Sequence, residues 1–325
     1  MPTVSIITAT KERPADLERA LRSSLDQAFS DFEHLVADDG SADDSASAVI
    51  EKIGDPRVRL VRLEVSKGPA GARNAAVAEA RGEFIAILDD DDLMLPGRLE
   101  TSVAFLRENP DCALVAGAYQ VIDEEGTVLA AVSPPTDPDR VAELLPVSNP
   151  VCHSTAMIRG DVMRELRGYR EAFRYSHDYD MVLRAARRGR IAILPTVLGA
   201  YRFHAKNISA GRCQLQGAYA EAVRAANAAG DDDFEIAAPA IQVSDSESEK
   251  SRAVGRVHYQ LGEWMFRDGR AAAARPHLWN AAKSEPIRPL VWGLLLATFV
   301  PRPVRGLFAP VLHPMMARRY PRWTR

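Results

Sequence analysis

Four consecutive aspartates follow an apolar stretch in the segment GEFIAILDDDDLMLP, which spans Gly82 to Pro96. Asp89 to Asp92 would lie at the end of a buried strand, where like charges repel one another. A hard divalent cation would relieve that repulsion, because Mg²⁺ and Mn²⁺ take oxygen ligands, often one or two carboxylates together with substrate phosphates. A solvated acidic loop is the alternative, in which Asp92 caps the helix that follows. The run alone leaves both interpretations open.

A second acidic turn, DDGSADDS, begins with Asp38 and Asp39. A carboxylate there can accept a hydrogen bond from a nucleobase N–H group or a ribose hydroxyl. Aspartate is also favoured in a turn ahead of a glycine, here Gly40, so turn formation is the competing explanation. The segment KGPAGARNAA has glycines that let the main chain approach a ligand, but it matches neither GxGxxG nor GxxxxGK[ST]. This excludes a dinucleotide fingerprint and a Walker phosphate loop.

The acidic motifs follow predicted strands of an α/β fold. Strand patterns cover Val4–Thr8, Phe32–Ala37, Val58–Leu63 and Glu83–Leu88, and helical patterns cover Pro14–Gln27 and Gly71–Ala80. Their alternation predicts a mostly parallel sheet flanked by helices, with right-handed crossovers. Ligands bind at the carboxyl ends of the strands in such sheets. The polar residues expected there are Thr8, Thr10, Asp38, Asp39 and Asp89 to Asp92.

The next part of the chain has a less regular pattern. After Pro96 the sequence predicts a helix to Glu108, a strand over Cys112–Ala116 and a hairpin that turns at Gly126. HSTAMI and ILPTVLGAYRFH are predicted strands, and HDYDMVLRAARRG is a predicted helix that ends at Gly189. The acidic, serine-rich stretch around residues 230–250 predicts a flexible linker. The expected organisation is therefore a catalytic domain over 1–210, a helix and linker over 211–250, and a helical region over 251–325.

The helical region at the end of the chain has two features. YQLGEWMFRDGRAAAARPHLWNAAKSEP has the spacing of one tetratricopeptide-like helix pair, or of an ordinary helical hairpin. PLVWGLLLATFVP is shorter than the roughly 20 apolar residues that span a bilayer. The residues after it mix apolar side chains with arginines, a composition suited to an anionic membrane surface, although packing against the protein remains the alternative.

Composition and charge restrict the class of protein. The 325 residues carry a net charge of -3, which lacks the basic field that nucleic-acid binding needs. The three cysteines form no CxxC pair, which favours a reducing compartment and argues against a disulfide framework or a zinc site. TVSIITAT is a strand pattern, so we expect no signal peptide. The expected location is the cytoplasm, with peripheral attachment to the inner membrane face as an open possibility.

Three segments together resemble glycosyltransferase family 2. They begin at SIITATKERP, KGPAGARNAA and SHDYDMVLRA, and the resemblance covers roughly residues 3–209. It implies a GT-A fold and inverting transfer of a sugar from a nucleotide-diphosphate sugar, usually a UDP-sugar, with Mg²⁺ or Mn²⁺ as cofactor. The acceptor would be a hydroxyl of a saccharide or lipid-linked molecule, in cell-envelope polysaccharide or glycolipid synthesis.

The resemblance also assigns roles to particular residues. It implies a nucleotide site made of Thr8, Ala9, Thr10, Arg13, Asp39, Lys67, Arg73 and Asn74. The family's DxD motif falls on Asp89 and Asp91, with Asp91 as the direct metal ligand and His204 completing the metal shell. Asp89 would contact ribose or metal-bound water, as would Asp90, which is an extra acid for the family.

Asp178 in HDYD matches the position of the family's general base, where His177 replaces the usual glutamate. A carboxylate that takes the proton of the acceptor hydroxyl contributes roughly 10² to 10⁴ in rate. Asp180 is expected only to stabilise the first turn of its helix. His153 lines the acceptor site or is structural, and AKNISAGR is a candidate lid. Two alternatives remain at this point: a nucleotidyltransferase that makes nucleotide sugars, and a non-catalytic nucleotide-binding scaffold.

Overall fold

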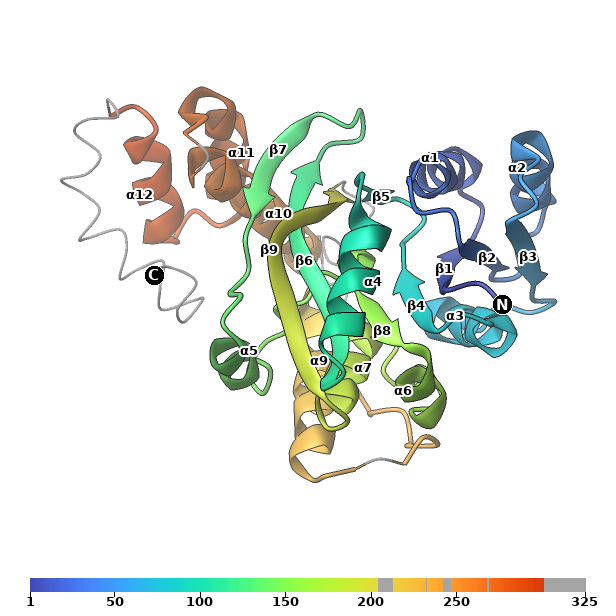
Figure 1. Cartoon of the computed structure of the whole chain (residues 1–325). Helices are drawn as coiled ribbons and strands as arrows, with labels where there is room; N and C mark the ends of the chain where they lie inside the picture. The colour runs from blue at the N-terminus through green and yellow to red at the C-terminus, as the bar shows by residue number, and fades with distance from the viewer. Residues whose placement is uncertain (204–212, 232, 242–246, 268, 301–325) are drawn as a thin grey trace. The chain divides into compact units, whose positions relative to one another are not determined.

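The computed structural model describes residues 1–203, 213–231, 233–241, 247–267 and 269–300 (Figure 1). Within these residues one nine-stranded sheet runs in the order β3-β2-β1-β4-β8-β6-β9-β5, and β7 pairs with β6. The chain divides into two compact units. The first contains residues 1–120, 132–202 and 217–241, and the second contains residues 121–131, 203–216 and 242–325.

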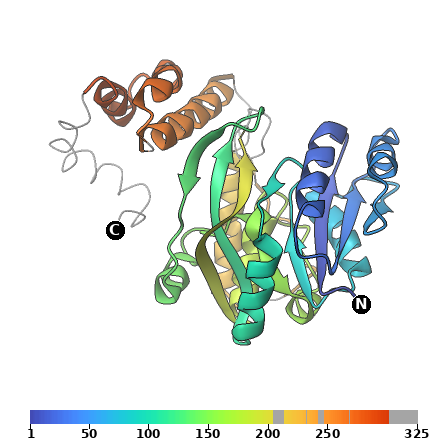
Figure 2. The same ribbon diagram turned by 45° about the horizontal axis from the view of Figure 1, so that its top comes forward.

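The first unit begins with a parallel half-sheet. Its strands are β1 (Val4–Thr10), β2 (Phe32–Asp38), β3 (Val58–Arg62) and β4 (Phe84–Ile87). Helices α1 (Pro14–Leu25) and α2 (Ser45–Ile53) cover one face, and α3 (Gly68–Glu79) covers the other (Figures 1 and 2). Side chains alternate between the two cores, since Val36 packs with α1 and α2 while Leu35 packs with α3. The predicted α/β fold with a parallel sheet flanked by helices is therefore confirmed.

The sheet continues beyond β4 with antiparallel pairing. β8 (Met157–Arg159) pairs with both β4 and β6 (Cys112–Ile122), and β5 (Leu93–Met94) pairs with β9 (Arg190–Arg202). The helices of this part are α4 (Arg98–Glu108), α5 (Pro138–Leu144), α6 (Gly160–Glu165), α7 (His177–Ala186) and α9 (Cys213–Ala228). The first half of the predicted HSTAMI strand is a 3₁₀ turn, His153–Thr155. This turn places the side chains of His153 and Ser154 beside Asp89, just after β4.

In its described residues, the second unit combines the tip of a hairpin with three helices. The hairpin turns at Gly126 and returns as β7 (Val128–Val132), and the helices are α10 (Glu247–Arg267), α11 (Ala271–Ser284) and α12 (Pro289–Ala297). α10 and α11 pack closely at Gly262, where a Cβ atom would come within 2.5 Å of the Leu278 side chain. α11, α12 and most of α10 fall within the predicted helical region 251–325, which is described only as far as residue 300. Among the described helices, none is long and apolar enough to cross a membrane.

The acidic stretch after α9 packs on the first unit as far as it is described. The Arg170 guanidinium donates to the main-chain carbonyls of Asp231 and Asp233, both at 3.2 Å. Phe234 lies 4.6 Å from the Arg167 guanidinium, and Ile236 packs against the main core. The first unit therefore extends to residue 241, beyond the boundary expected after residue 210.

One histidine of strand β2, His34, is fully buried and lies between β1 and α1. His34 is inaccessible to solvent, its Nε2 is 2.8 Å from the Thr8 hydroxyl, and its Nδ1 is 2.8 Å from the Ser24 hydroxyl. Burial, and secondarily the charge of Arg98, lowers the pKa of His34 to about 3. The imidazole is therefore neutral in the folded protein at any ordinary pH.

We expect this histidine to make the protein sensitive to mild acid. Below the ordinary pKa of about 6.5 the unfolded chain binds a proton that folded His34 does not, so stability falls progressively from that pH towards about 3. Between about pH 7.5 and about pH 5 the loss from this residue is about 2 kcal/mol. The free energy of unfolding of His34→Gln, measured with urea at a series of pH values, should lack this part of the decrease towards acid pH. Ser24→Ala, which removes a hydrogen bond but no titrating group, should keep it; equal slopes in His34→Gln and wild type would contradict the assignment.

Candidate active site

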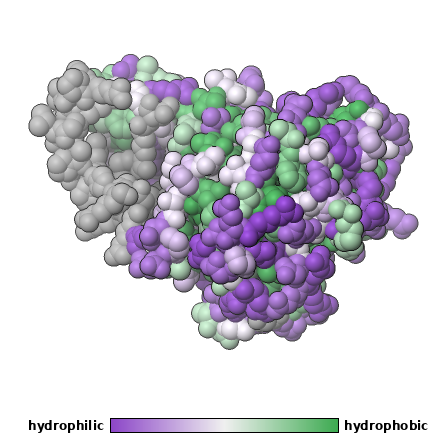
Figure 3. Space-filling view, viewed as in Figure 1, coloured by the Kyte–Doolittle hydropathy of each residue, from purple (hydrophilic) through white to green (hydrophobic). Residues whose placement is uncertain are grey.

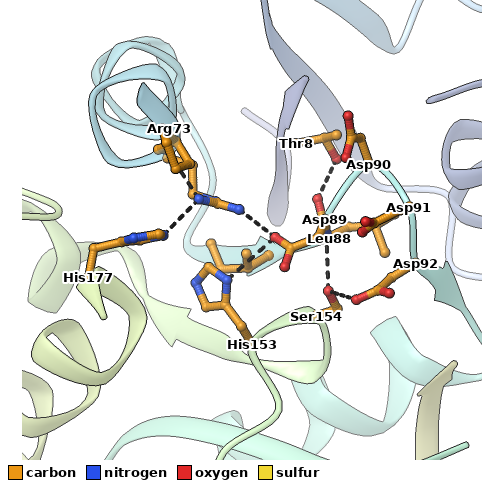
Figure 4. Close-up of polar contacts among 12 residues, drawn as sticks. Thr8, Arg73, Leu88, Asp89, Asp90, Asp91, Asp92, His153, Ser154 and His177 are labelled. Atoms are coloured by element: carbon orange, nitrogen blue, oxygen red, sulfur yellow. Dashed lines mark hydrogen bonds and ion pairs between the residues drawn. The ribbon is translucent and has the colours of Figure 1, made fainter. Parts of the chain in front are cut away.

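Polar groups gather where the parallel strands end. β2, β1 and β4 are neighbours in the sheet, so the residues after them meet at one edge (Figure 4). Thr10 ends β1, Asp39 follows β2, and Asp89 to Asp92 follow β4. Helix α3 brings Arg73 to this edge, and the start of α7 brings His177.

Asp89 is held in an ion pair with a buried arginine. The Arg73 guanidinium, 5% exposed, donates to the Asp89 carboxylate at 2.5 Å, and His153 Nδ1 lies 3.5 Å from the same oxygen. Burial by itself would raise the pKa of Asp89, but Arg73 and His153 hold it well below its usual range. The Asp89 N–H donates to the Ser154 hydroxyl at 3.2 Å. Asp89 is therefore ionised and fixed in direction.

His177 binds the other side of the same guanidinium. Arg73 Nη1 lies 2.9 Å from His177 Nε2, and because arginine can only donate, that nitrogen must be the acceptor of a neutral ring. Burial, then the charge of Arg73, lowers the pKa of His177 to about 4. Its ring meets those of His153 and Tyr169 edge to face, with centroids 6.1 and 5.6 Å away. The residue that replaces the family's glutamate is thus an uncharged acceptor, which leaves Asp89 as the carboxylate in contact with Arg73.

Asp90 and Asp91 share a second arginine. Arg13 Nη1 lies 3.3 Å from an Asp90 oxygen and 3.1 Å from an Asp91 oxygen, and the Thr10 hydroxyl donates to Asp90 at 2.8 Å. Burial and the neighbouring Asp91 carboxylate raise the pKa of Asp90 to about 7. The Arg13 guanidinium thus already lies beside Asp90 and Asp91, whose neighbouring carboxylates attract positive charge.

These oxygen donors fit a divalent cation of the Mg²⁺ or Mn²⁺ type. Within the described ranges no group of three His, Cys, Asp or Glu side chains converges as a complete metal site. A cation at Asp91 would therefore depend on further oxygens, such as those of a diphosphate. The predicted ligand His204 and the candidate lid AKNISAGR lie outside the described residues.

Asp92 does not cap a helix, contrary to one of the sequence expectations. β5 intervenes, and α4 begins at Arg98 with Gly97 as its N-cap. The Asp92 carboxylate, 1% exposed, instead accepts from the Arg202 N–H at 2.7 Å and from the Ser154 hydroxyl. Arg202 Nε also donates to the Asp91 carbonyl at 2.9 Å. Asp92 and Arg202 therefore fasten the aspartate loop to the end of β9.

The carboxylates of the DDGS turn bind groups of the protein itself, within the turn and in the loop before α3. Asp39 accepts from the Ser66 hydroxyl at 2.7 Å and from the main-chain N–H groups of Lys67 and Gly68 at 2.7 and 3.1 Å. Asp38 accepts from the main-chain N–H of Ser41 at 3.0 Å. Asp39 thus fixes the loop that leads into α3, and its contact with a nucleotide stays a prediction.

Two residues predicted to bind the nucleotide have their polar groups turned elsewhere. The Thr8 hydroxyl is fully buried and donates to the Leu88 carbonyl at 2.8 Å. Asn74 makes two 2.8 Å hydrogen bonds to the main chain of Tyr169, one through its amide oxygen and one through its nitrogen. These side chains hold the fold around the site instead of facing a donor. The remaining two residues predicted to bind the nucleotide are more accessible than Thr8: Ala9 is half-buried and the Lys67 side chain is exposed.

Asp178 lies in the first turn of α7, half-buried, and accepts from the Asn149 amide at 3.2 Å. Its charge acts on Arg73, raising the pKa of that guanidinium together with Asp89 and against the effect of burial. Asp180 points into the core, where it forms ion pairs with Arg170 and Arg184. Sequence reasoning missed Asn149, which precedes the 3₁₀ turn, and Ser154, which lies in it, because no motif marks either residue.

The family described as glycosyl transferase family 2 matches residues 5–167, half of the chain. The chain belongs to this family. EpsE of Bacillus subtilis is 31% identical over 193 residues, which are 58% of this chain and 68% of EpsE. The O-antigen biosynthesis glycosyltransferase WbnJ of Escherichia coli is 31% identical over 56% of this chain and 70% of WbnJ. This protein is therefore a glycosyltransferase, and the nucleotidyltransferase and scaffold alternatives are set aside.

A third relative and two solved structures are also similar to this glycosyltransferase. WfgD of Escherichia coli, a UDP-Glc:alpha-D-GlcNAc-diphosphoundecaprenol beta-1,3-glucosyltransferase, is 35% identical over 40% of this chain and 51% of WfgD. TarS 1-349 of S. aureus superposes with a TM-score of 0.56 at 17% identity, covering 100% of this chain and 93% of TarS 1-349. The mannosyltransferase PcManGT of Pyrobaculum calidifontis, solved with GDP-Man and Mn²⁺, gives 0.55 at 19% identity, covering 98% and 86%. These superpositions confirm the GT-A fold.

Proposed function

We propose that this glycosyltransferase moves a sugar from a nucleotide-diphosphate sugar to a hydroxyl acceptor, with inversion at the anomeric carbon and with a divalent metal. A UDP-sugar is the first candidate donor, because WfgD uses UDP-Glc and TarS has been solved with UDP. A saccharide or lipid-linked acceptor in cell-envelope glycan synthesis is the matching proposal, since WbnJ and WfgD act in that chemistry. The proposed location is the cytoplasm, at the inner membrane face.

The observation that carries this proposal is the position of Arg73. Its guanidinium contacts Asp89 at the end of β4 and His177 at the start of α7, and the charge of Asp178 acts on it from the same helix. One buried cation therefore joins the loop proposed to hold the donor to the start of the helix that carries the proposed base. Such an arrangement lets the two reactants be positioned against each other.

Asp178 is the proposed general base. Its carboxylate takes the proton of the acceptor hydroxyl as the new C–O bond forms and the bond to the diphosphate breaks. The Asn149 amide, which donates to the same carboxylate at 3.2 Å, orients it. An in-line attack of this kind gives inversion, because the acceptor enters opposite to the leaving diphosphate.

The leaving diphosphate is the second charge that the site has to stabilise. Asp91, together with Asp89 and His204, is proposed to hold Mg²⁺ or Mn²⁺, which when bound supplies Lewis-acid stabilisation of the departing oxygen. Arg13 lies against Asp90 and Asp91 and is placed to neutralise further negative charge. Asp39 is proposed to contact the base or ribose, and residues 205–212 are the proposed lid.

A donor screen tests the proposed reaction. The protein is incubated with Mn²⁺ and UDP-, GDP- and dTDP-sugars in turn, and the release of nucleoside diphosphate is measured by chromatography. We expect slow hydrolysis of one nucleotide class, because water replaces the missing acceptor at the activated anomeric carbon. Saturable binding of that donor should accompany it. Absence of both hydrolysis and binding across the panel would overturn the proposed donor chemistry.

A further inference from the structure

Helix α12 is apolar on both sides. Val291, Leu294 and Leu295 form a buried inner face at helical spacing. On the outer side, Leu296 is 66% exposed, and Phe299, just after the helix, is 62% exposed. A helix that is hydrophobic all round is normally buried. The outer side of α12 is therefore apolar apart from the Arg275 guanidinium, which lies 4.2 Å from the centroid of the Phe299 ring.

The exposed side continues onto α11 and the turn between the two helices. Trp279 and Trp292 meet edge to face with ring centroids 6.0 Å apart, and the Trp292 indole N–H donates to the Pro286 carbonyl at 2.9 Å. Ile287 in the turn is 93% exposed. We define the α12 patch as Trp279, Ile287, Trp292, Leu296 and Phe299.

The α12 patch is unusual for this chain. It holds five of the ten large apolar side chains that are exposed among the described residues. In the space-filling view the surface around α9, in the first unit, is by contrast mostly hydrophilic (Figure 3). Apolar side chains gathered on neighbouring helices mark an interaction site more often than scattered residues do.

The charge of the surrounding sequence indicates the partner. Residues 286–325 contain seven arginines and no aspartate or glutamate, although the whole chain has a net charge of -3. Anionic lipid headgroups attract such a segment, and tryptophan favours the boundary between lipid and water. A second copy of the same patch would bring two arginine-rich segments together, which like charges oppose. An anionic bilayer therefore fits better than self-association.

We propose that the α12 patch inserts into the surface of an anionic membrane. This extends the proposed membrane contact of residues 301–325 to a described surface. α12 has nine residues, so it would lie in the interfacial region without crossing the bilayer. Trp279 and Trp292 would face the lipid boundary, while the arginines pair with headgroups. The glycosyltransferase would thereby remain at the surface that carries a lipid-linked acceptor, if its acceptor is of that class.

Flotation with lipid vesicles tests the proposal. The full chain is mixed with vesicles of phosphatidylcholine alone or with about one third phosphatidylglycerol, and the bound fraction is measured. We expect binding to the anionic vesicles and at least about tenfold less binding for Leu296→Ser/Phe299→Ser, since each side chain loses its transfer from water to lipid. Both residues are exposed, so the fold should tolerate the changes.

The control variant changes two exposed valines of the first unit, Val65→Ser/Val147→Ser, and should bind vesicles as the wild type does. Equal binding of wild type and the patch variant would overturn the proposal. So would a concentration-dependent dimer that the patch variant loses while vesicle binding persists, because a second copy would then cover the patch. Hydrolysis of a soluble donor should be the same in all three proteins, so this result is separate from the test of the proposed reaction.

Discussion

Replacing Asp178 with asparagine is expected to lower kcat by about 10² to 10⁴-fold while donor binding stays close to that of the wild type. Asparagine has the size of aspartate and still offers an oxygen to the Asn149 amide, so the start of α7 should keep its conformation. It cannot take a proton from the acceptor hydroxyl. The measurement is turnover at saturating donor and acceptor, together with donor affinity by calorimetry.

Asp161→Asn provides the matched control. Asp161 is an exposed acid in the first turn of α6, as Asp178 is a first-turn acid in α7, and it has no place in the site. The control should keep wild-type kcat. Near-normal turnover by a folded, donor-binding Asp178→Asn protein would show that another group is the base.

Removal of divalent metal should lower turnover at least about 100-fold, and adding back Mn²⁺ or Mg²⁺ should restore it. Asp91→Asn should raise the metal concentration needed for half-maximal activity, because the amide is a weaker oxygen donor than the carboxylate. Titration of activity with Mn²⁺ in wild type and variant measures both effects. Asp55→Asn, which disturbs an ion pair with Arg57 at the start of β3 and not at its carboxyl end, should need the same Mn²⁺ concentration as the wild type.

The Arg13 guanidinium lies where it would compete with a bound metal ion. Because its guanidinium lies against Asp90 and Asp91, Arg13→Gln should remove a positive charge that competes with the metal. Half-maximal activity should then occur at lower Mn²⁺ than in wild type, although the total rate falls if Arg13 also holds the diphosphate. Activity that is indifferent to a chelator in all variants would be evidence against a metal-dependent reaction.

The strands could be predicted because their residues are strongly β-forming and because acidic turns follow β2 and β4. The segments that became β1 and β4 are short apolar runs, and polar residues stand where β1, β2 and β4 end. The direction of individual side chains could not be predicted there. Both faces of a parallel half-sheet are covered, so a strand such as β1 is buried at all but one position and shows no alternation of buried and exposed residues. Thr8 therefore looked available to a nucleotide when its hydroxyl bonds to Leu88 and His34.

The partners of the acidic residues were equally hidden from the sequence. Asp39 accepts hydrogen bonds from two main-chain N–H groups and Asp92 from one, and such groups, which every residue except proline carries, leave no motif in the sequence. The acidic stretch after α9 shows the same effect, since main-chain carbonyls of Asp231 and Asp233 bind Arg170. A composition typical of a linker does not reveal such contacts.

The two contacts of the Arg73 guanidinium, with Asp89 and with His177, have a kinetic consequence. One guanidinium binds Asp89, which the donor is proposed to engage, and His177, the residue immediately before the proposed base. If the donor moves Asp89, Arg73 moves with it, and the contact of Arg73 with His177 at the start of α7 then changes. We infer that the base reaches its working alignment only after the donor has bound, so that substrates add in a compulsory order with donor first. In that order the glycosylated product should inhibit noncompetitively against both donor and acceptor, and competitive inhibition by that product against acceptor would indicate random addition.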